Sequence, residues 1–130
     1  MTKVAIITGS SRGIGAACAF KFAAKGYSLT IQGRDADKLA EVEKKCVELG
    51  GQVLALNFDL SKTERLHEIV DQTIAKFGRL DILVNNAGMM KPGGLEDQTS
   101  DDFDFVMAVN CKAPVFLLQA ALPHLKASKG

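Results

Sequence analysis

Short apolar runs alternate with segments of helical periodicity along the whole sequence. Four runs rich in Val, Ile and Leu are typical of buried strands, and they occupy residues 3–8, 28–32, 52–58 and 81–85. After each run, apolar residues recur at steps of three and four, which is the period of one helix face. The order βαβαβαβα predicts a parallel sheet covered by helices on both faces, a doubly wound α/β fold.

The third helical segment has the clearest start and period. Ser61 and Glu64 have the spacing of a capping box, so we expect the helix to begin there. Asp35 is expected to cap the second helix. The apolar face of the third helix is formed by Leu66, Ile69, Val70, Thr73, Ile74 and Phe77. Glycines that follow the first three helices, where a left-handed residue often ends a helix, are Gly26, Gly50 with Gly51, and Gly78.

A glycine-rich segment, TGSSRGIG at residues 8–15, joins the first strand to the first helix. N–H groups at a helix start are unpaired and lie at the positive end of the helix dipole, so they suit a pyrophosphate. Gly9 would permit a tight turn, Gly13 would let phosphate approach the backbone, and Gly15 would let the helix pack on the sheet. The spacing G-x-x-x-G-x-G differs from the common dinucleotide fingerprint, and a turn without a ligand is the alternative.

A second motif, NNAG at residues 85–88, directly follows the fourth strand. The small residues Ala87 and Gly88 leave room for a flat adenine or ribose ring, and asparagine amides can link neighbouring strand ends. Alone, this motif is more typical of an ordinary turn. Together with TGSSRGIG it resembles the short-chain dehydrogenase/reductase family, and the resemblance extends over the whole chain.

The resemblance implies a Rossmann-type doubly wound parallel sheet with strand order 3-2-1-4, truncated after the fourth strand and its following helices. It also implies one NAD(P)-binding domain over residues 1–130, incomplete at its C-terminal end. The carboxylate of Asp59 would accept a hydrogen bond from the adenine amino group, or serve as a helix N-terminal charge. The residues expected to bind the cofactor are Gly9, Ser11, Arg12, Gly13, Ile14, Gly15, Arg34, Asp59, Leu60, Asn86, Ala87 and Gly88.

The residues after the second strand favour NADP(H) over NAD(H). An acidic residue there would accept the ribose hydroxyls of NAD and repel a 2′-phosphate, but the position is Gly33. Arg34 follows it, and Arg12 lies in the glycine-rich segment, so two guanidinium groups could bind a 2′-phosphate. Asp35 and Asp37 weaken this argument slightly, although the expected role of Asp35 is the helix cap.

The chemistry that the family implies is hydride transfer between a nicotinamide and a carbonyl or alcohol substrate. It requires a tyrosine acid, a lysine four residues later and a serine that orients the substrate. The only tyrosine, Tyr27, is followed four residues later by Ile31, so it cannot serve. Asn110 matches the family's asparagine that holds a water of the proton relay, or it is a structural amide bonded to backbone. We therefore expect the cofactor-binding half of an oxidoreductase, inactive alone.

The segment after the fourth strand favours association. Without a fifth strand the fourth lies at the sheet edge, and the next helix lacks its usual neighbours. We expect a homo-oligomer, or association with a complementing half. The loop over residues 88–98 would lie on the ligand side of the sheet. The apolar residues of the helix are Val115, Phe116, Leu117, Leu118, Ala120 and Leu122.

Composition argues against several other functions. The net charge is +1 with both signs interspersed, so neither nucleic acid nor a membrane is an expected partner. The sequence has no charged leader, no apolar stretch of about 18 residues and no C-x-x-C pair, which indicates a cytoplasmic protein. His67 and His124 lack nearby ligands, so no metal site is expected.

Two functions from other classes compete with the oxidoreductase. A non-catalytic nucleotide-binding or regulatory module would keep the glycine-rich segment without the chemistry. A phospho-acceptor receiver domain would need acidic residues at the end of the first strand, and residues 3–10 contain none.

Overall fold

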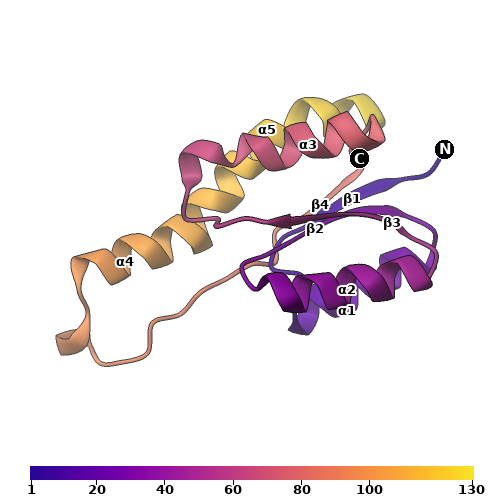
Figure 1. Cartoon of the computed structure of the whole chain (residues 1–130). Helices are drawn as coiled ribbons and strands as arrows, with labels where there is room; N and C mark the ends of the chain where they lie inside the picture. Colours follow the sequence, from indigo (N-terminus) through magenta and orange to yellow (C-terminus); the bar gives the residue numbers. More distant parts are fainter.

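The computed structural model describes all residues from Met1 to Gly130. Its centre is a four-stranded parallel sheet with the order β3-β2-β1-β4 (Figure 1). The strands are β1 (Val4–Ile7), β2 (Ser28–Gly33), β3 (Gln52–Asn57) and β4 (Ile82–Val84). All three strand pairs are parallel. The predicted α/β fold and strand order are therefore confirmed.

Helices cover both faces of this sheet. α1 (Gly13–Ala24) and α2 (Ala36–Glu48) lie on one face, and α3 (His67–Phe77) and α5 (Ala113–Ser128) lie on the other (Figure 1). α4 (Ser100–Met107) continues through a π-helical turn into α5 and extends beyond the sheet (Figure 1). Because all strands are parallel, their C-terminal ends share one edge of the sheet, where the connecting segments meet.

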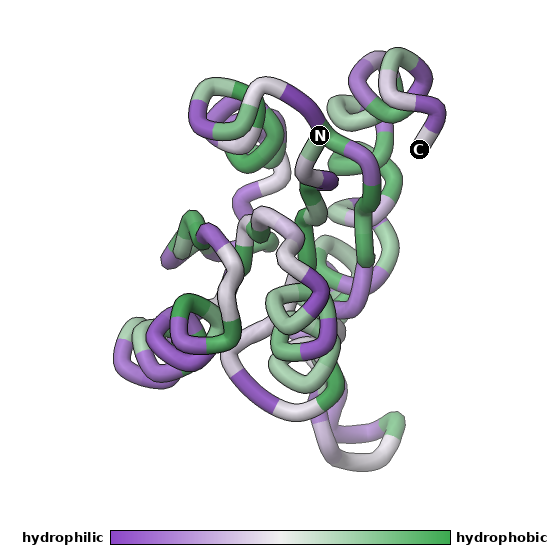
Figure 2. The backbone as a smooth tube through the Cα atoms, turned by 90° about the vertical axis from the view of Figure 1, so that its right-hand side faces the viewer, coloured by the Kyte–Doolittle hydropathy of each residue, from purple (hydrophilic) through white to green (hydrophobic).

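Two apolar clusters fill the space between the sheet and its helices. On one face, Ala16, Ala19 and Ala23 of α1 belong to the same buried cluster as residues of β1 and β2. On the other face, Ile69 of α3 and Leu117 of α5 pack in a second buried cluster. Alternate residues of β1 enter opposite clusters, which is why this strand is apolar throughout. The helices alternate between hydrophilic and hydrophobic stretches, as amphipathic helices do (Figure 2).

The start of α3 differs from the prediction. The expected capping box of Ser61 and Glu64 is wrong, because Asp59 Oδ1 accepts the N–H of Ser61 at 2.9 Å. A 3-10 turn, Thr63–Arg65, then leads into α3, which begins at His67 without a side-chain cap. An aspartate at a strand end can bind the N–H two residues later, and here it replaces the serine cap.

The other helix ends mostly agree with the sequence. Asp35 caps α2, with its Oδ1 accepting the N–H of Lys38 at 3.1 Å. The left-handed residue after α5 is Lys129, with φ 58°, while Gly130 donates its N–H to Leu125. The glycines with positive φ after the first three helices are Gly26, Gly50 and Gly78, as expected.

The helical segment Ser100–Ser128 is long and apolar enough to cross a membrane by length and composition, which we did not expect. Ala113, Leu117 and Ala121 of this segment are buried in the cluster shared with α3. A single helix of this kind is weak evidence for a membrane protein, and only 22% of its apolar window is buried in the fold. The predicted exposed apolar face is confirmed apart from the buried Leu117 and the half-buried Ala120, and its large exposed residues are Val115, Phe116, Leu118 and Leu122.

Candidate functional site

A pocket of about 670 Å³ lies at the C-terminal ends of the central strands. The connection after β1 leads to α1 on one face of the sheet, whereas the connection after β4 leads to α4 and α5 on the other. Parallel sheets bind ligands where neighbouring connections separate in this way. The lining residues are Gly9, Ser11, Arg12, Gly13, Ile14, Gln32, Gly33, Arg34, Asp35, Lys38, Leu60, Asn86, Ala87, Gly88, Met89 and Val109.

The glycine-rich segment forms one wall of the pocket. Gly9 and Gly13 have φ 62° and 58°, the left-handed region that favours glycine. A Cβ on Gly9 would lie 2.8 Å from Ala87 Cα, and one on Gly15 would lie 2.6 Å from Asn86 Nδ2. α1 starts at Gly13 with no side-chain cap and no acidic residue in its first turn. Its first N–H groups therefore have no side-chain partner and suit an anionic ligand.

Hydrogen bonds join the glycine-rich segment to the NNAG segment. Asn86 Nδ2 donates to the carbonyl oxygens of Thr8 and Gly9, both at 3.1 Å. Thr8 Oγ1 accepts the N–H groups of Asn86 and Ala87, both at 3.0 Å. The expected link between strand ends is therefore made by Asn86, while Asn85 is exposed. These bonds fix the two walls of the pocket relative to each other.

A buried glutamine that the sequence analysis missed supports the same wall. Gln32 in β2 is only 2% exposed, and its Oε1 accepts the N–H of Gly9 at 2.8 Å. Its Nε2 donates to the carbonyl oxygen of Phe58 at 2.6 Å. Ser10 Oγ accepts the Gln32 N–H at 2.9 Å and donates to the Ile7 carbonyl at 2.8 Å. The sequence offered one signal for this role: Gln32 lies within an apolar strand, and a buried amide needs hydrogen-bond partners.

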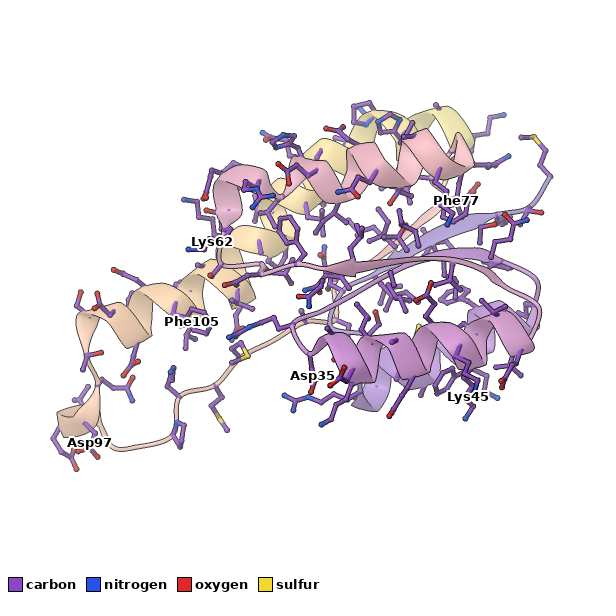
Figure 3. All side chains as sticks on the ribbon, in the orientation of Figure 1. Asp35, Lys45, Lys62, Phe77, Asp97 and Phe105 are labelled. Carbon is purple, nitrogen blue, oxygen red and sulfur yellow. The ribbon has the colours of Figure 1, made fainter.

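Positive charge gathers at the end of the pocket beside the start of α2. Three cationic side chains line this end: Arg12, Arg34 and Lys38. Asp35 is the only carboxylate among the lining residues, and its Oδ1 caps α2 at the N–H of Lys38. Figure 3 shows Asp35 at this end of α2. The pocket is therefore suited to an anion at this end, and Lys38 adds a cation that we did not predict.

Neighbouring residues keep this end of the pocket free of acidic groups other than Asp35. A Cβ on Gly33 would lie 2.7 Å from Ser11 Cβ, so no larger side chain fits there without movement. Asp59 does not line the pocket. Partial burial opposes ionisation of its carboxyl, but hydrogen bonds from Ser61 and the charge of Arg34 outweigh burial and lower its pKa. Asp59 is therefore an ionised turn residue near the pocket.

The remaining wall is apolar and flat. Leu60 and Val109 are 5% and 4% exposed, and they line the pocket together with Ala87 and Gly88. Val109 comes from the π-helical turn between α4 and α5, so its place was not apparent from the sequence. Such small and apolar residues leave room for a planar ring.

Asn110 lies outside this pocket, on the wall of a smaller one of about 390 Å³. The helical pattern places it on one side with Phe103, Val106 and Met107, and all four line this smaller pocket. That side is open to solvent and not inward-facing as expected, since Phe103, Met107 and Asn110 are exposed. Asn110 Oδ1 accepts the N–H of Met89 and its Nδ2 donates to the Met89 carbonyl, both at 2.6 Å. The amide is therefore fully paired with backbone.

Most of the predicted cofactor residues thus meet around one pocket. Gly15 and Asp59 lie outside its lining. Gly15 lets α1 pack closely against Gly9 and Asn86, and Asp59 Oδ1 accepts the N–H of Ser61. The predicted residues that line the pocket are Gly9, Ser11, Arg12, Gly13, Ile14, Arg34, Leu60, Asn86, Ala87 and Gly88. The lining residues outside the predicted set are Gln32, Gly33, Asp35, Lys38, Met89 and Val109.

The chain is similar to known proteins over its whole length. It is 41% identical over 130 residues to the 11-beta-hydroxysteroid dehydrogenase-like 4A protein of Arabidopsis thaliana, a match that covers 98% of the chain and 44% of the relative. A metagenomic short-chain oxidoreductase in complex with NADP is 41% identical with a TM-score of 0.92, covering 98% of the chain and 58% of that structure. A short chain dehydrogenase from Mycobacterium paratuberculosis bound to NAD is 32% identical with a TM-score of 0.86, covering 95% and 50%.

The similar structures therefore include proteins with either nicotinamide dinucleotide. The chain spans less than half the length of its Arabidopsis relative and about half that of the two structures. The pattern of the family described as short chain dehydrogenase matches residues 3–130. That match, together with the shared sheet topology and glycine-rich pocket wall, shows that the chain belongs to the short chain dehydrogenase family.

Proposed function

We propose that residues 1–130 are the cofactor-binding part of an oxidoreductase that transfers hydride between NADP(H) and a carbonyl or alcohol substrate. The observation that carries this proposal is the pocket in which an uncapped helix start and three cations meet, with no free carboxylate. Uncapped helix N–H groups suit a pyrophosphate, and the cations suit the extra 2′-phosphate of NADP(H). When bound, the dinucleotide supplies or accepts the hydride.

Each wall of the pocket has a proposed role. The backbone of residues 9–15 holds the pyrophosphate, and Arg12, Arg34 and Lys38 hold the 2′-phosphate. The flat apolar wall takes the adenine ring, with the ionised Asp59 near its edge. The full set of proposed cofactor residues is the predicted one with Lys38 and Val109 added.

The preference for NADP(H) rests on Gly33 and its neighbours. An NAD-specific site needs a carboxylate for the ribose hydroxyls, but a side chain at Gly33 would meet Ser11. Asp35 already caps a helix, which occupies one of its oxygens. The one carboxylate on the lining, Asp35, is therefore held at the helix start, and Arg34 and Lys38 are available to a 2′-phosphate.

For catalysis we propose that Asn110 supports the proton relay, acting through backbone groups because its side chain is paired with Met89. The 130 residues contain no Tyr-x-x-x-Lys segment, so we expect this polypeptide alone to bind cofactor without turnover. The second candidate is a nucleotide-binding module without catalysis, which would use the same pocket. A longer form that carries such a segment and reduces a ketone would exclude this second candidate.

We also propose that the chain associates, with itself or with a complementing half, through the exposed apolar face of α5. Val115, Phe116 and Leu118 are each at least 41% exposed on this helix. The three cysteines are free thiols, which fits the proposed cytoplasmic location.

The test is calorimetric titration of the 130-residue chain with NADPH and with NADH. We expect tighter binding of NADPH, and Arg34→Asp should weaken it by about 10- to 100-fold with little change for NADH, because a charge-assisted pair becomes a repulsion. Lys44→Asp on the exposed side of α2 makes the same change in net charge and should leave binding intact. Equal affinities for the two cofactors, unaffected by Arg34→Asp, would contradict the proposed preference.

A further inference from the structure

Arg34 does not extend freely into solvent, because its guanidinium contacts an aromatic ring of a distant helix. The guanidinium carbon lies 5.5 Å from the ring centroid of Phe105. Phe105 belongs to α4 (Figure 3) and precedes Val109, which lines the pocket, by about one helical turn. The ring therefore contacts Arg34 beside the end of the pocket that carries the positive charge.

The same ring also contacts the loop over residues 88–98. Lys91 Nζ lies 5.6 Å from the Phe105 centroid and 3.6 Å from Asp102 Oδ1. Phe105 is only half-buried, and no residue of α4 is fully buried. Phe105 belongs to neither buried apolar cluster, and two cations lie over its ring, so the apolar core does not account for its place.

An arginine at a pocket edge is costly to order when it must bind a phosphate. Its long side chain samples many rotamers, and binding restricts them. A guanidinium held over an aromatic face has already lost much of that freedom. In this structure Arg34 lines the pocket while it contacts Phe105, so the two arrangements are compatible.

We infer that Phe105 is a positioning residue that holds Arg34 at the pocket edge and so contributes to the selectivity for NADP(H) over NAD(H). This inference rests on the proposed function, because it requires that Arg34 bind the 2′-phosphate. Phe105 itself touches no phosphate, and its effect passes entirely through Arg34. The opposite arrangement, in which the ring withholds Arg34 from the cofactor, predicts tighter NADPH binding when the ring is removed.

The variant Phe105→Leu removes the aromatic face and keeps an apolar side chain. We expect NADPH to bind about two- to fivefold more weakly, because one exposed cation–π contact is lost. NADH binding should be unchanged. Phe105→Tyr keeps the ring and should restore NADPH binding. Phe103→Leu is the matched control, because Phe103 is 61% exposed on the same helix and contacts no cation.

A double-mutant cycle separates positioning from general damage to the helix. In the Arg34→Ala background, Phe105→Leu should cause no further loss of NADPH affinity. Far-UV circular dichroism checks folding, and Phe105→Met replaces the leucine variant if that variant loses helix. A loss of affinity that persists without Arg34, an equal loss for NADH, or tighter NADPH binding would each overturn the inference.

The outcomes also distinguish this inference from the proposed function. If the wild-type chain binds NADPH and NADH equally, the proposed preference fails and the role of Phe105 fails with it. If Arg34→Asp removes a clear preference for NADPH and Phe105→Leu does not weaken it, only the role of Phe105 is overturned.

Discussion

Replacing Gly9 by alanine should destabilise the chain more than the same replacement at Gly13. The two glycines have nearly the same backbone, with φ 62° and 58°, so each substitution forces alanine into the left-handed region at about 1–2 kcal/mol. Their surroundings differ. A Cβ on Gly9 would lie 2.8 Å from the Cα and 3.1 Å from the Cβ of Ala87, whereas a Cβ on Gly13 would meet nothing within 4 Å.

The closest contact of Gly9 is with backbone, which cannot turn away as a flexible side chain can. The NNAG segment would have to move, although the Asn86 amide and the Thr8 hydroxyl hold it with bonds of 3.0–3.1 Å. Overpacking of this kind costs about 1–3 kcal/mol. Gly9→Ala should therefore lower the free energy of unfolding by about 2–5 kcal/mol, against about 1–2 kcal/mol for Gly13→Ala.

Urea unfolding followed by far-UV circular dichroism measures this difference. If the m-values are equal, the two variants should differ in midpoint by about 1 M, with Gly9→Ala the lower. Gly13→Ala should still weaken NADPH binding, because its Cβ enters space on the pocket wall proposed for phosphate. Equal midpoints for the two variants would refute the reasoning, since the contact with Ala87 is their main structural difference.

Two further predictions concern buried titratable groups. Buried Asp81 accepts the Val4 N–H at 2.9 Å and the Arg79 Nε–H at 2.8 Å, and the bond from Arg79 lowers the pKa of its carboxyl. Because the folded pKa is the lower one, this stabilisation is complete above the unfolded pKa of about 3.9 and is lost as the pH falls through the folded value. In the Asp81→Asn variant the urea midpoint should fall less steeply as the pH is lowered into the acid range. An unchanged slope of urea midpoint against pH would contradict this. Burial raises the pKa of the Cys46 thiol to about 11, whereas Cys111 is exposed. A thiol reagent at about pH 8 should therefore label Cys111 first, and Cys46 only when the chain unfolds. Equal labelling rates of the two thiols in the folded chain would contradict this.

The fold could be predicted because its strands and most of its helix ends follow the sequence patterns that are typical of buried strands and helix caps. The four apolar runs became strands within a few residues of the expected bounds, since a sheet buried on both faces needs uninterrupted apolar residues. The expected start of α3 failed because two local caps compete there. Asp59 binds the N–H of Ser61, and the sequence alone does not decide between an aspartate turn and a serine cap.

The site was predictable where backbone shape determines it. The glycines and the NNAG segment require particular turns, and those turns form the pocket walls. Gln32 and Lys38 were missed for another reason. A glutamine in a strand and a lysine in a helix have many ordinary roles, and only the arrangement of β1, β2 and α2 in the fold brings them to the pocket.

Asn110 marks the limit of arguments from periodicity. Periodicity groups Asn110 correctly with Phe103, Val106 and Met107, which line one pocket with it, but it shows neither that this side of the helix is exposed nor that a π-helical turn carries Asn110. That turn also brings Val109 into the pocket wall. Local deviations of this kind depend on tertiary contacts, here the pair of bonds between Asn110 and Met89.

The bonds between the glycine-rich and NNAG segments bear on how a dinucleotide would bind. Thr8 and Asn86 are 78 positions apart, yet hydrogen bonds from their side chains join the two pocket walls directly. A ligand that enters this pocket does not have to order the walls, so less of its binding energy is lost on entry. The smaller pocket differs, because Met90 and Phe103 on its wall are 81% and 61% exposed. The walls of the pocket proposed for the cofactor are therefore fixed within these 130 residues to a degree that the surface around Asn110 is not.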